Sequence, residues 1–309
     1  MARNALTTMR LWHLINKQDG RILAAVAALG LSFKGIFVKL IYLQHNIDAI
    51  TLLTLRMIFS LPVFIYVLSV VTPRPQIYPK HLMQLLLLGF LGYYLASLFD
   101  FIGLQYVSVG LERLILFTYP ALVILIESFY RKRPIARRTY LAMLLAYLGL
   151  WIAFQHDLAY SGDKALVGSL WILACSICYC GYYLGNAHLL RQISAPALVS
   201  LTGIVASLCI FTHFLLTTPL HRLSAMPITV WGWSALLALF STVLPAYLLI
   251  QAIEKIGASH SASISIIGPI ITLLLGWVIL SEPFSWLQIL GLGLVLSGVY
   301  QLKKSPTTN

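Results

Sequence analysis

The chain repeats its own pattern of prolines and apolar residues at a fixed spacing of 149 residues. Pro120 and Pro134 recur as Pro269 and Pro283, and the two copies align without a gap over about residues 87–150 of the first copy. Side-chain identity between the copies is low, but the breaks and the apolar runs agree. A chain that repeats once in this way is expected to be built from two copies of one structural unit.

The composition of both copies is that of a chain embedded in lipid. Hydrophobic residues make up 60% of the 309 residues and charged residues make up 10%, whereas a soluble domain carries roughly 25% charged residues. This length accommodates about ten spans of about twenty residues with short connections. We therefore predict an all-α polytopic membrane protein with about ten transmembrane helices.

The predicted spans fall into two groups of five. A basic segment over 1–21 precedes a first repeat over 22–156, and a second repeat over 166–302 is followed by a short tail over 303–309. The spans are expected at 22–42, 49–71, 82–103, 107–129, 138–156, 166–185, 197–217, 228–252, 258–280 and 285–302.

The lysines and arginines give the predicted orientation. Of these 21 residues, 15 fall in segments on one side of the membrane, 2 (Lys164 and Arg222) fall on the other, and 4 lie within spans. Cytoplasmic loops carry the excess of such residues, so both termini are expected in the cytoplasm. Because each repeat has an odd number of spans, the second repeat enters the membrane from the opposite side to the first. The prediction is therefore two inverted five-helix repeats. The chain has a formal net charge of +12. Its basic residues lie mostly between apolar runs, which indicates a lipid bilayer rather than nucleic acid as the partner.

The sequence offers no pattern typical of an enzyme. The histidines do not form an HExxH pair, no GxSxG is present, and the four cysteines lie inside apolar segments. We therefore expect no catalytic residues, no metal site and no cofactor.

Two of the repeated prolines fall in the middle of predicted spans. Pro120 lies about midway along the fourth span and Pro269 about midway along the ninth. Proline lacks an N–H group, so the carbonyls of Leu116 and Ser265 are expected to lose their helical partners. Such carbonyls are costly in lipid unless they face protein or a water-filled cavity. The pair therefore indicates either a central binding site or two ordinary kinks that help packing.

The proline-containing segments resemble a known family. The stretch DFIGLQYVSVGLERLILFTYPALVILIESFYRKRPI at 100–135, and GASHSASISIIGPIITLLLGWVILSEPFSWLQILGLGLVLSGVY in the second half, are similar to the repeats of EamA-type proteins of the drug/metabolite transporter superfamily. The resemblance covers about residues 22–302. It implies a multi-pass carrier of the cell inner (plasma) membrane that moves a small metabolite by alternating access. In that family the cavity is lined mainly by the first, third and fourth helices and by the sixth, eighth and ninth.

Candidate residues for such a cavity follow from the depth of each residue in its span and from the helices implied by the resemblance. Lys34 lies about twelve residues into the first span, near the bilayer midplane, and several tyrosines lie on the implied lining helices, where ordinary packing is the alternative role. The candidates are Lys34, Tyr94, Tyr119, Pro120, Tyr179, Tyr183, Tyr247, Ser265 and Pro269.

Four charged residues lie inside the spans of the first repeat: Arg56, Asp100, Glu112 and Arg113. Ionised groups at such depth usually face the protein interior or a cavity and have a partner of opposite charge. One hypothesis is that a carboxylate carries a coupling proton, or that the arginines hold an anionic group. The other, which we favour from the sequence, is a buried ion-pair network that fixes the helices.

The predicted function is that of a secondary transporter, an exporter of a small metabolite, with a small-molecule substrate and a midplane cavity. The alternatives are a structural or sensory membrane protein that does not transport, or a channel. The substrate, the transport direction and the choice between monomer and homodimer stay open at this point.

Overall fold

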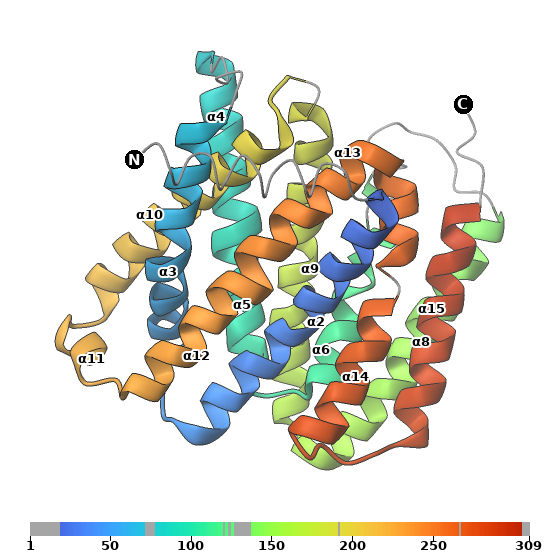
Figure 1. Cartoon of the computed structure of the whole chain (residues 1–309). Coiled ribbons are helices and arrows are strands. Elements are labelled where there is room, and N and C mark those ends of the chain that lie inside the picture. Colours follow the sequence, from blue (N-terminus) through green and yellow to red (C-terminus); the bar gives the residue numbers. More distant parts are fainter. Residues whose placement is uncertain are drawn as a thin grey trace.

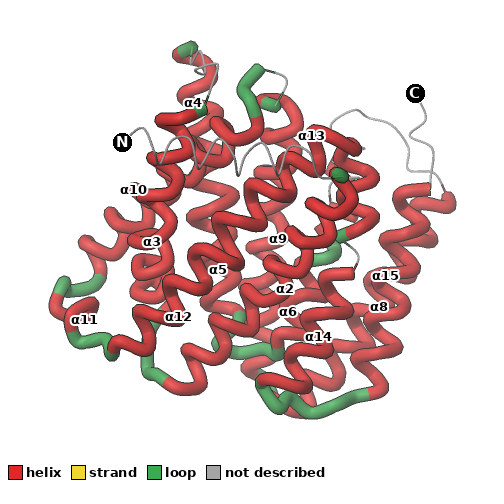
Figure 2. Tube along the Cα trace, in the orientation of Figure 1, coloured by secondary structure: helices red, strands yellow, loops and turns green. Residues whose placement is uncertain are grey.

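The computed structural model describes residues 19–71, 78–119, 121–122, 125–126, 137–190, 192–265 and 267–304, and within them it contains helices and loops but no strand (Figure 2). The helices are α2 Gly20–Gln44, α3 Ala49–Val70, α4 Pro79–Leu88, η1 Gly89–Leu95, α5 Ala96–Gly103, α6 Val109–Leu116, α8 Arg137–Ser161, α9 Lys164–Leu189, α10 Ala195–Thr217, α11 His221–Ser224, α12 Ile228–Ala238, η2 Leu239–Val243, α13 Leu244–Ile264, α14 Ile267–Ile279 and α15 Trp286–Lys304.

The long helices run back and forth between two ends of the molecule (Figure 1). Among the described residues, seven helices are long and apolar enough to cross a membrane, and the shorter helices over 267–279 and 286–301 are also apolar. The protein is thus a multi-pass helical membrane protein. We call the end at which α2 begins and α15 ends the terminal end, and the other the opposite end.

Side-chain and proline caps define where several helices begin. The carboxylate of Asp48 accepts a hydrogen bond from the Thr51 N–H at the start of α3, at 2.9 Å, which satisfies a backbone donor that has no partner within the helix. Helices α4 and α10 instead carry a proline in their first turn, where a missing N–H costs nothing.

The last helices of the two repeats, α8 and α15, pack along each other through equivalent glycines (Figure 1). A Cβ on Gly149 would lie 2.5 Å from the Gly291 carbonyl oxygen, and a Cβ on Gly298 would lie 2.5 Å from the Ala142 carbonyl oxygen. The offset of 149 residues converts the first contact into the second with the partners exchanged. The interface is therefore pseudo-symmetric, as expected where an inverted pair of units meets.

Each repeat also contains a π-helical segment at the same place. The third helix of the first repeat continues through η1, and its counterpart continues through η2, which lies within the range that the 149-residue offset assigns to η1. A π-helical turn inserts residues into the i→i−4 ladder and changes which side chains face the neighbours, and such turns occur often at functional sites. The Thr242 hydroxyl donates to the carbonyl five residues earlier, that of Leu237, at 3.1 Å.

The boundary between the eighth and ninth predicted spans was wrong. Helix α13 continues to Ile264, past the break expected at 253–257, and α14 begins only at Ile267. Pro269 accordingly lies in the first turn of α14, where its missing N–H leaves no gap. The Ser265 carbonyl, which was expected to lose its partner, accepts a hydrogen bond from the Gly268 N–H at 3.0 Å. Pro120 lies outside the described residues.

The first repeat has a helix end at the position equivalent to this break. Helix α6 stops at Leu116, and Leu116 plus 149 is Ser265, the residue that follows α13. The Ile115 carbonyl accepts hydrogen bonds from the Thr118 N–H, the Thr118 hydroxyl at 2.6 Å and the Ser176 hydroxyl at 3.1 Å. Side-chain hydroxyls thus satisfy the backbone where the helix is interrupted.

Candidate functional site: a cavity between the two repeats

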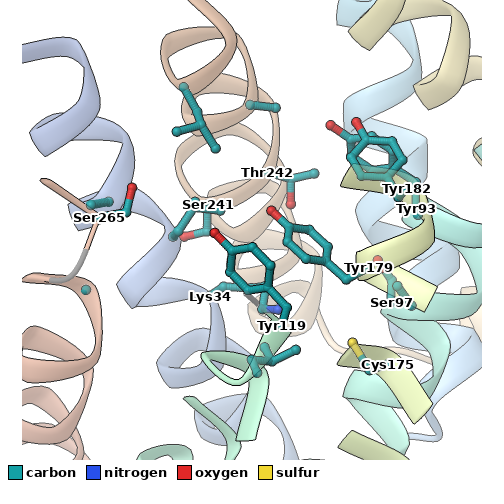
Figure 3. A pocket seen from close by; sticks show the side chains of 18 of the residues that line it. Lys34, Tyr93, Ser97, Tyr119, Cys175, Tyr179, Tyr182, Ser241, Thr242 and Ser265 are labelled. Atoms are coloured by element: carbon teal, nitrogen blue, oxygen red, sulfur yellow. The ribbon is translucent and has the colours of Figure 1, made fainter. Parts of the chain in front are cut away.

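A cavity of about 440 Å³ lies between helices of both repeats (Figure 3). Most of its lining comes from α2, the η1–α5 region, α6, α9 and the η2–α13 region. The lining residues are Ala28, Leu31, Ser32, Lys34, Arg56, Gly92, Tyr93, Ala96, Ser97, Arg113, Leu116, Phe117, Tyr119, Cys175, Tyr179, Tyr182, Asn186, Leu190, Val199, Ser241, Thr242, Ala246, Leu249, Ile250, Ile253, Ser265, Gly268 and Pro269.

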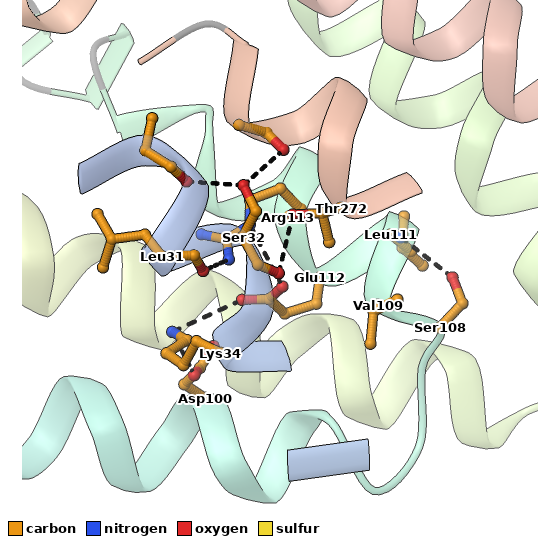
Figure 4. A network of polar contacts seen from close by, with 12 residues as sticks. Leu31, Ser32, Lys34, Asp100, Ser108, Val109, Leu111, Glu112, Arg113 and Thr272 are labelled. Carbon is orange, nitrogen blue, oxygen red and sulfur yellow. Dashed lines mark hydrogen bonds and ion pairs between the residues drawn. The ribbon is translucent and has the colours of Figure 1, made fainter. Parts of the chain in front are cut away.

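A buried charge cluster, made of Lys34, Asp100, Glu112 and Arg113, lies at one wall of this cavity (Figure 4). The Lys34 Nζ lies 2.7 Å from Asp100 Oδ2 and 3.8 Å from Glu112 Oε1. The Arg113 Nε lies 3.9 Å from Glu112 Oε2, and its Nη2 donates to the Leu31 carbonyl. Both carboxylates are fully buried, so two cations offset two carboxylates behind the cavity surface.

Arg56 stands apart from this charge cluster. Its side chain is buried and lines the cavity, and its guanidinium carbon lies 4.9 Å from the centre of the Phe101 ring. Stacking on an aromatic face is a favourable environment for a guanidinium. Within the part of the chain that the structure describes, no carboxylate lies within 4.0 Å of Arg56.

Four tyrosines form a belt along the cavity (Figure 3): Tyr93, Tyr119, Tyr179 and Tyr182. The ring centres of Tyr93 and Tyr182 are 5.5 Å apart, and those of Tyr119 and Tyr179 are 5.3 Å apart, with edge-to-face geometry in both pairs. The rings of Tyr179 and Tyr182 join the two pairs at 6.1 Å. The tyrosine belt gives the cavity an aromatic wall, made of ring faces and edges, with hydroxyl groups along it.

The cavity extends from the middle of the molecule toward the terminal end. Its lining includes Leu190, which caps the end of α9, Val199 in the first turns of α10, and Ile253 near the middle of α13. All three positions lie in the half of the molecule that contains the start of α2, where Gly20 packs against Ile256.

Side chains from three segments meet at the opposite end of the molecule. Asp157 of α8 accepts hydrogen bonds from the Ser108 N–H at 2.8 Å and from the Ser108 hydroxyl at 2.9 Å, and Glu282 accepts one from the Val109 N–H at 3.0 Å. Both carboxylates thereby cap the first turn of α6, where backbone N–H groups lack helical partners. Burial raises the pKa of the Glu282 carboxyl to about 7, although the Val109 bond and the nearby Lys39 act to lower the pKa.

Lys39 completes this arrangement, which we call the opposite-end latch (Lys39, Ser108, Asp157 and Glu282). Its Nζ donates to the carbonyls of Leu104 and Val107 at 2.8 and 2.7 Å. These bonds join α2 to the loop between α5 and α6. The Lys39 side chain therefore points to that loop and does not extend toward solvent. The latch therefore connects α2, α6, α8 and the loop before α15 at one end of the molecule.

The candidate cavity residues fall into three groups. Lys34, Tyr119, Tyr179, Ser265 and Pro269 line the cavity. Tyr94 and Tyr247 lie outside its lining: the Tyr94 hydroxyl lies 3.0 Å from His213 Nδ1, and the Tyr247 hydroxyl lies 2.7 Å from the Ser200 hydroxyl. Pro120 and the side chain of Tyr183 lie outside the described residues.

Sequence reasoning did not select several residues that the structure brings to this region. Tyr93 and Tyr182 are recognised on the implied lining helices but not chosen as candidates, because no spacing rule distinguishes a lining tyrosine from a packing one. Ser241 and Thr242 face the cavity because of η2, and a π-helical segment has no clear signal in a single sequence. Asp157 lies at the end of a predicted span, and its role requires a partner 49 residues away.

Comparison with known proteins identifies the family. The model of the EamA-like transporter family matches residues 19–155 and again residues 166–302. The chain belongs to the EamA-like transporter family. This assignment agrees with the two-repeat, all-helical membrane fold and makes the protein a membrane transporter.

The relatives of this EamA-family protein carry transporter names. It is 28% identical over 279 residues to "Uncharacterized transporter YcbK" of Bacillus subtilis (strain 168), covering 89% of each chain. It is 25% identical over 204 residues to "Threonine/homoserine exporter RhtA" of Escherichia coli (strain K12), covering 64% of this chain and 63% of that one. A solved crystal structure aligns with a TM-score of 0.65 at 16% identity, covers 92% of this chain and 96% of the other, and shows the same fold.

Proposed function

We propose that this EamA-family transporter is an exporter of a small metabolite in the cell inner (plasma) membrane that works by alternating access around the cavity between its repeats. The observation that carries the proposal is the asymmetry of the cavity. Its lining reaches toward the terminal end, while the latch joins four elements at the opposite end. This is the arrangement expected of a carrier that faces one side of the membrane.

The direction of transport follows from the proposed orientation. The excess of lysine and arginine supports a cytoplasmic terminal end, so the cavity would receive its substrate from the cytoplasm. A relative named as an exporter is consistent with this direction. Reporter fusions after Ser161 and after Asn309 should report opposite sides of the membrane, and the same side for both contradicts the orientation.

Two experiments test transport itself. Metabolite profiles of cells that overproduce the chain, compared with a deletion strain, should show one class of compound moving from the cells to the medium. Flux of that compound into liposomes containing the purified chain should saturate with concentration, as a carrier requires. Steady ionic conductance instead indicates a channel, and the absence of any flux indicates a structural or sensory role.

Alternating access requires the opposite-end latch to open. In a chain whose four native cysteines are replaced, Ser108→Cys with Asp157→Cys places two thiols where the native side chains lie 2.9 Å apart. A short bifunctional thiol reagent should then stop flux, and reductive cleavage should restore it. Each single cysteine variant treated in the same way is the control. Unchanged flux in the cross-linked double variant contradicts alternating access.

A further inference from the structure

The cavity contains a buried cation, Arg56, that has no carboxylate within 4.0 Å among the described residues. The side chain of Arg56 is 2% exposed, and its Nε and Nη2 have no hydrogen-bond partner. A buried charge without a partner is costly for folding. A transporter keeps such a group at low cost only if something that enters the cavity provides the missing partner.

The neighbouring cations have direct carboxylate partners, whereas Asp100, whose charge also acts on Arg56, is in contact with Lys34 instead. Lys34 and Arg113 lie against Asp100 and Glu112, at distances of 2.7 to 3.9 Å. The two carboxylates are fully buried and do not belong to the lining. Among the described lining residues, three are cations and none is a carboxylate. A ligand in the cavity thus meets an excess of positive charge and no carboxylate to receive an ammonium group.

The rest of the lining indicates the body of the ligand. The tyrosine belt provides an aromatic wall beside the polar groups of Ser97, Ser241 and Thr242 (Figure 3). A cavity of about 440 Å³ is in the range of small-molecule sites. A guanidinium presents two parallel N–H groups to a carboxylate, which gives the pair both strength and orientation.

We propose that the cavity takes a small organic monoanion, a carboxylate on an apolar body, and that Arg56 is the residue that binds the carboxylate. This assignment rests on the proposed transport function and names its substrate class. It separates the substrate from zwitterionic amino acids and from organic cations, because both carry an ammonium group for which the described lining provides no carboxylate.

The binding test compares compounds of similar shape and different charge. The purified full chain in detergent is titrated with benzoate, 3-phenylpropionate and indole-3-acetate, and with 3-phenylpropionamide, phenylalanine and phenethylamine. At least one of the three carboxylates should raise the thermal stability and bind roughly 10- to 100-fold more tightly than the uncharged amide, the range for a hydrogen-bonded charge pair. If no carboxylate exceeds the amide, the proposal is wrong.

Variants at position 56 identify the binding residue. Arg56→Met should remove the preference for the carboxylate over the amide, and Arg56→Lys should retain only part of it because the ammonium cannot bind in a bidentate way. The ligand-free Arg56→Met protein should be at least as thermally stable as the original, since an unpaired buried charge is removed. Arg222→Met is the matched control: this arginine is 52% exposed, lies 3.4 Å from Asp48, and is remote from the cavity, so the preference should persist. A large loss of thermal stability in ligand-free Arg56→Met, or an unchanged preference in that variant, overturns the role of Arg56.

Flux measurements separate the two proposals. Binding of a carboxylate without flux in liposomes contradicts the transport function and leaves the anion site standing. Flux of phenylalanine or phenethylamine, with no binding or flux of benzoate, 3-phenylpropionate or indole-3-acetate, supports transport and overturns the anion site. Arg56-dependent flux of a carboxylate supports both.

Discussion

The Lys34 ammonium lies 2.7 Å from the Asp100 carboxylate and so joins α2 to α5 beside the cavity. The same ammonium lies 3.8 Å from Glu112 of α6. One cation therefore connects three helices of the first repeat, while the equivalents of Asp100 and Glu112 in the second repeat are Leu249 and Ser261. The scaffold is repeated, but its buried charges are not.

The charge cluster predicts a specific pattern of stability. Lys34→Met leaves the buried Asp100 carboxylate without its nearest cation and should lower the free energy of unfolding by about 3–5 kcal/mol. The double variant Lys34→Met/Asp100→Leu removes both charges and should recover part of that loss. Thermal unfolding in detergent measures both effects.

Two outcomes would contradict a purely structural role for this cluster. Strictly additive losses, with no recovery in the double variant, indicate that Lys34 and Asp100 do not stabilise each other. A normally folded Asp100→Asn protein whose flux no longer depends on a pH gradient indicates instead that the carboxylate carries a coupling proton.

The packing of α8 on α15 predicts that glycine is needed only where the backbones meet. Gly298→Ala places a Cβ 2.5 Å from the Ala142 carbonyl oxygen and 2.8 Å from the N and Cβ of Ala146. It should destabilise the protein by roughly 1–3 kcal/mol, because these main-chain and Cβ atoms cannot move aside without shifting the helix. Gly293→Ala is the matched control on the same helix, since nothing lies within 4 Å of its Cβ. It should be neutral or slightly stabilising. Equal losses in both variants would show that helix flexibility, rather than close approach, matters here.

Glu282 predicts a pH dependence of stability. Its folded-state pKa is raised by burial from the ordinary 4.5 to about 7, so between these values the folded protein holds a proton that the unfolded chain has released. Stability from this group is therefore greatest at low pH and falls as the pH rises to 7, by up to about 3 kcal/mol. Glu282→Gln cannot ionise, so the difference in Tm between pH 5 and pH 8 should shrink. A variant that becomes relatively less stable at pH 8 contradicts this sign.

The loop that carries Glu282 contains a backbone strain that can be relieved. Ser281 has a φ of 53°, a left-handed conformation that costs a residue other than glycine about 1 kcal/mol or more. Ser281→Gly should therefore raise the free energy of unfolding by up to about 1 kcal/mol. Gly162 has a φ of 61° in a turn with open space around it, and Gly162→Ala should have the opposite sign. A destabilised Ser281→Gly protein would show that its side chain contributes more than the strain costs.

The sequence predicted the membrane fold well because lipid leaves few alternatives. In lipid, a continuous apolar run of span length satisfies its own backbone hydrogen bonds by forming a helix, and the family match over both halves agrees. The break between the eighth and ninth spans was misplaced because Gly257 and its neighbours indicate a turn, while the structure continues α13 through them. Local propensity does not decide helix ends in a packed bundle.

Much less of the cavity could be predicted. The depth of Lys34 pointed to the cavity, but its partners Asp100 and Glu112 required knowledge of how α2 faces α5 and α6. Arg56 was grouped with the charge network from depth alone, whereas its guanidinium lies over the Phe101 ring and, among the described residues, no carboxylate lies within 4.0 Å of it. The facing direction of a side chain in a uniformly apolar helix is set by packing, and no periodicity reports it.

The contact between Gly149 and Gly291 has a consequence for how the two repeats assemble. Because it becomes the contact between Gly298 and Ala142 when the repeats are exchanged, a single five-helix unit has both halves of this interface on its own surface. Such a unit can pair with an inverted copy of itself without any covalent link. Two separately synthesised fragments, 1–162 and 163–309, are accordingly expected to assemble in one membrane. The covalent connection between the repeats would then not be required for the fold.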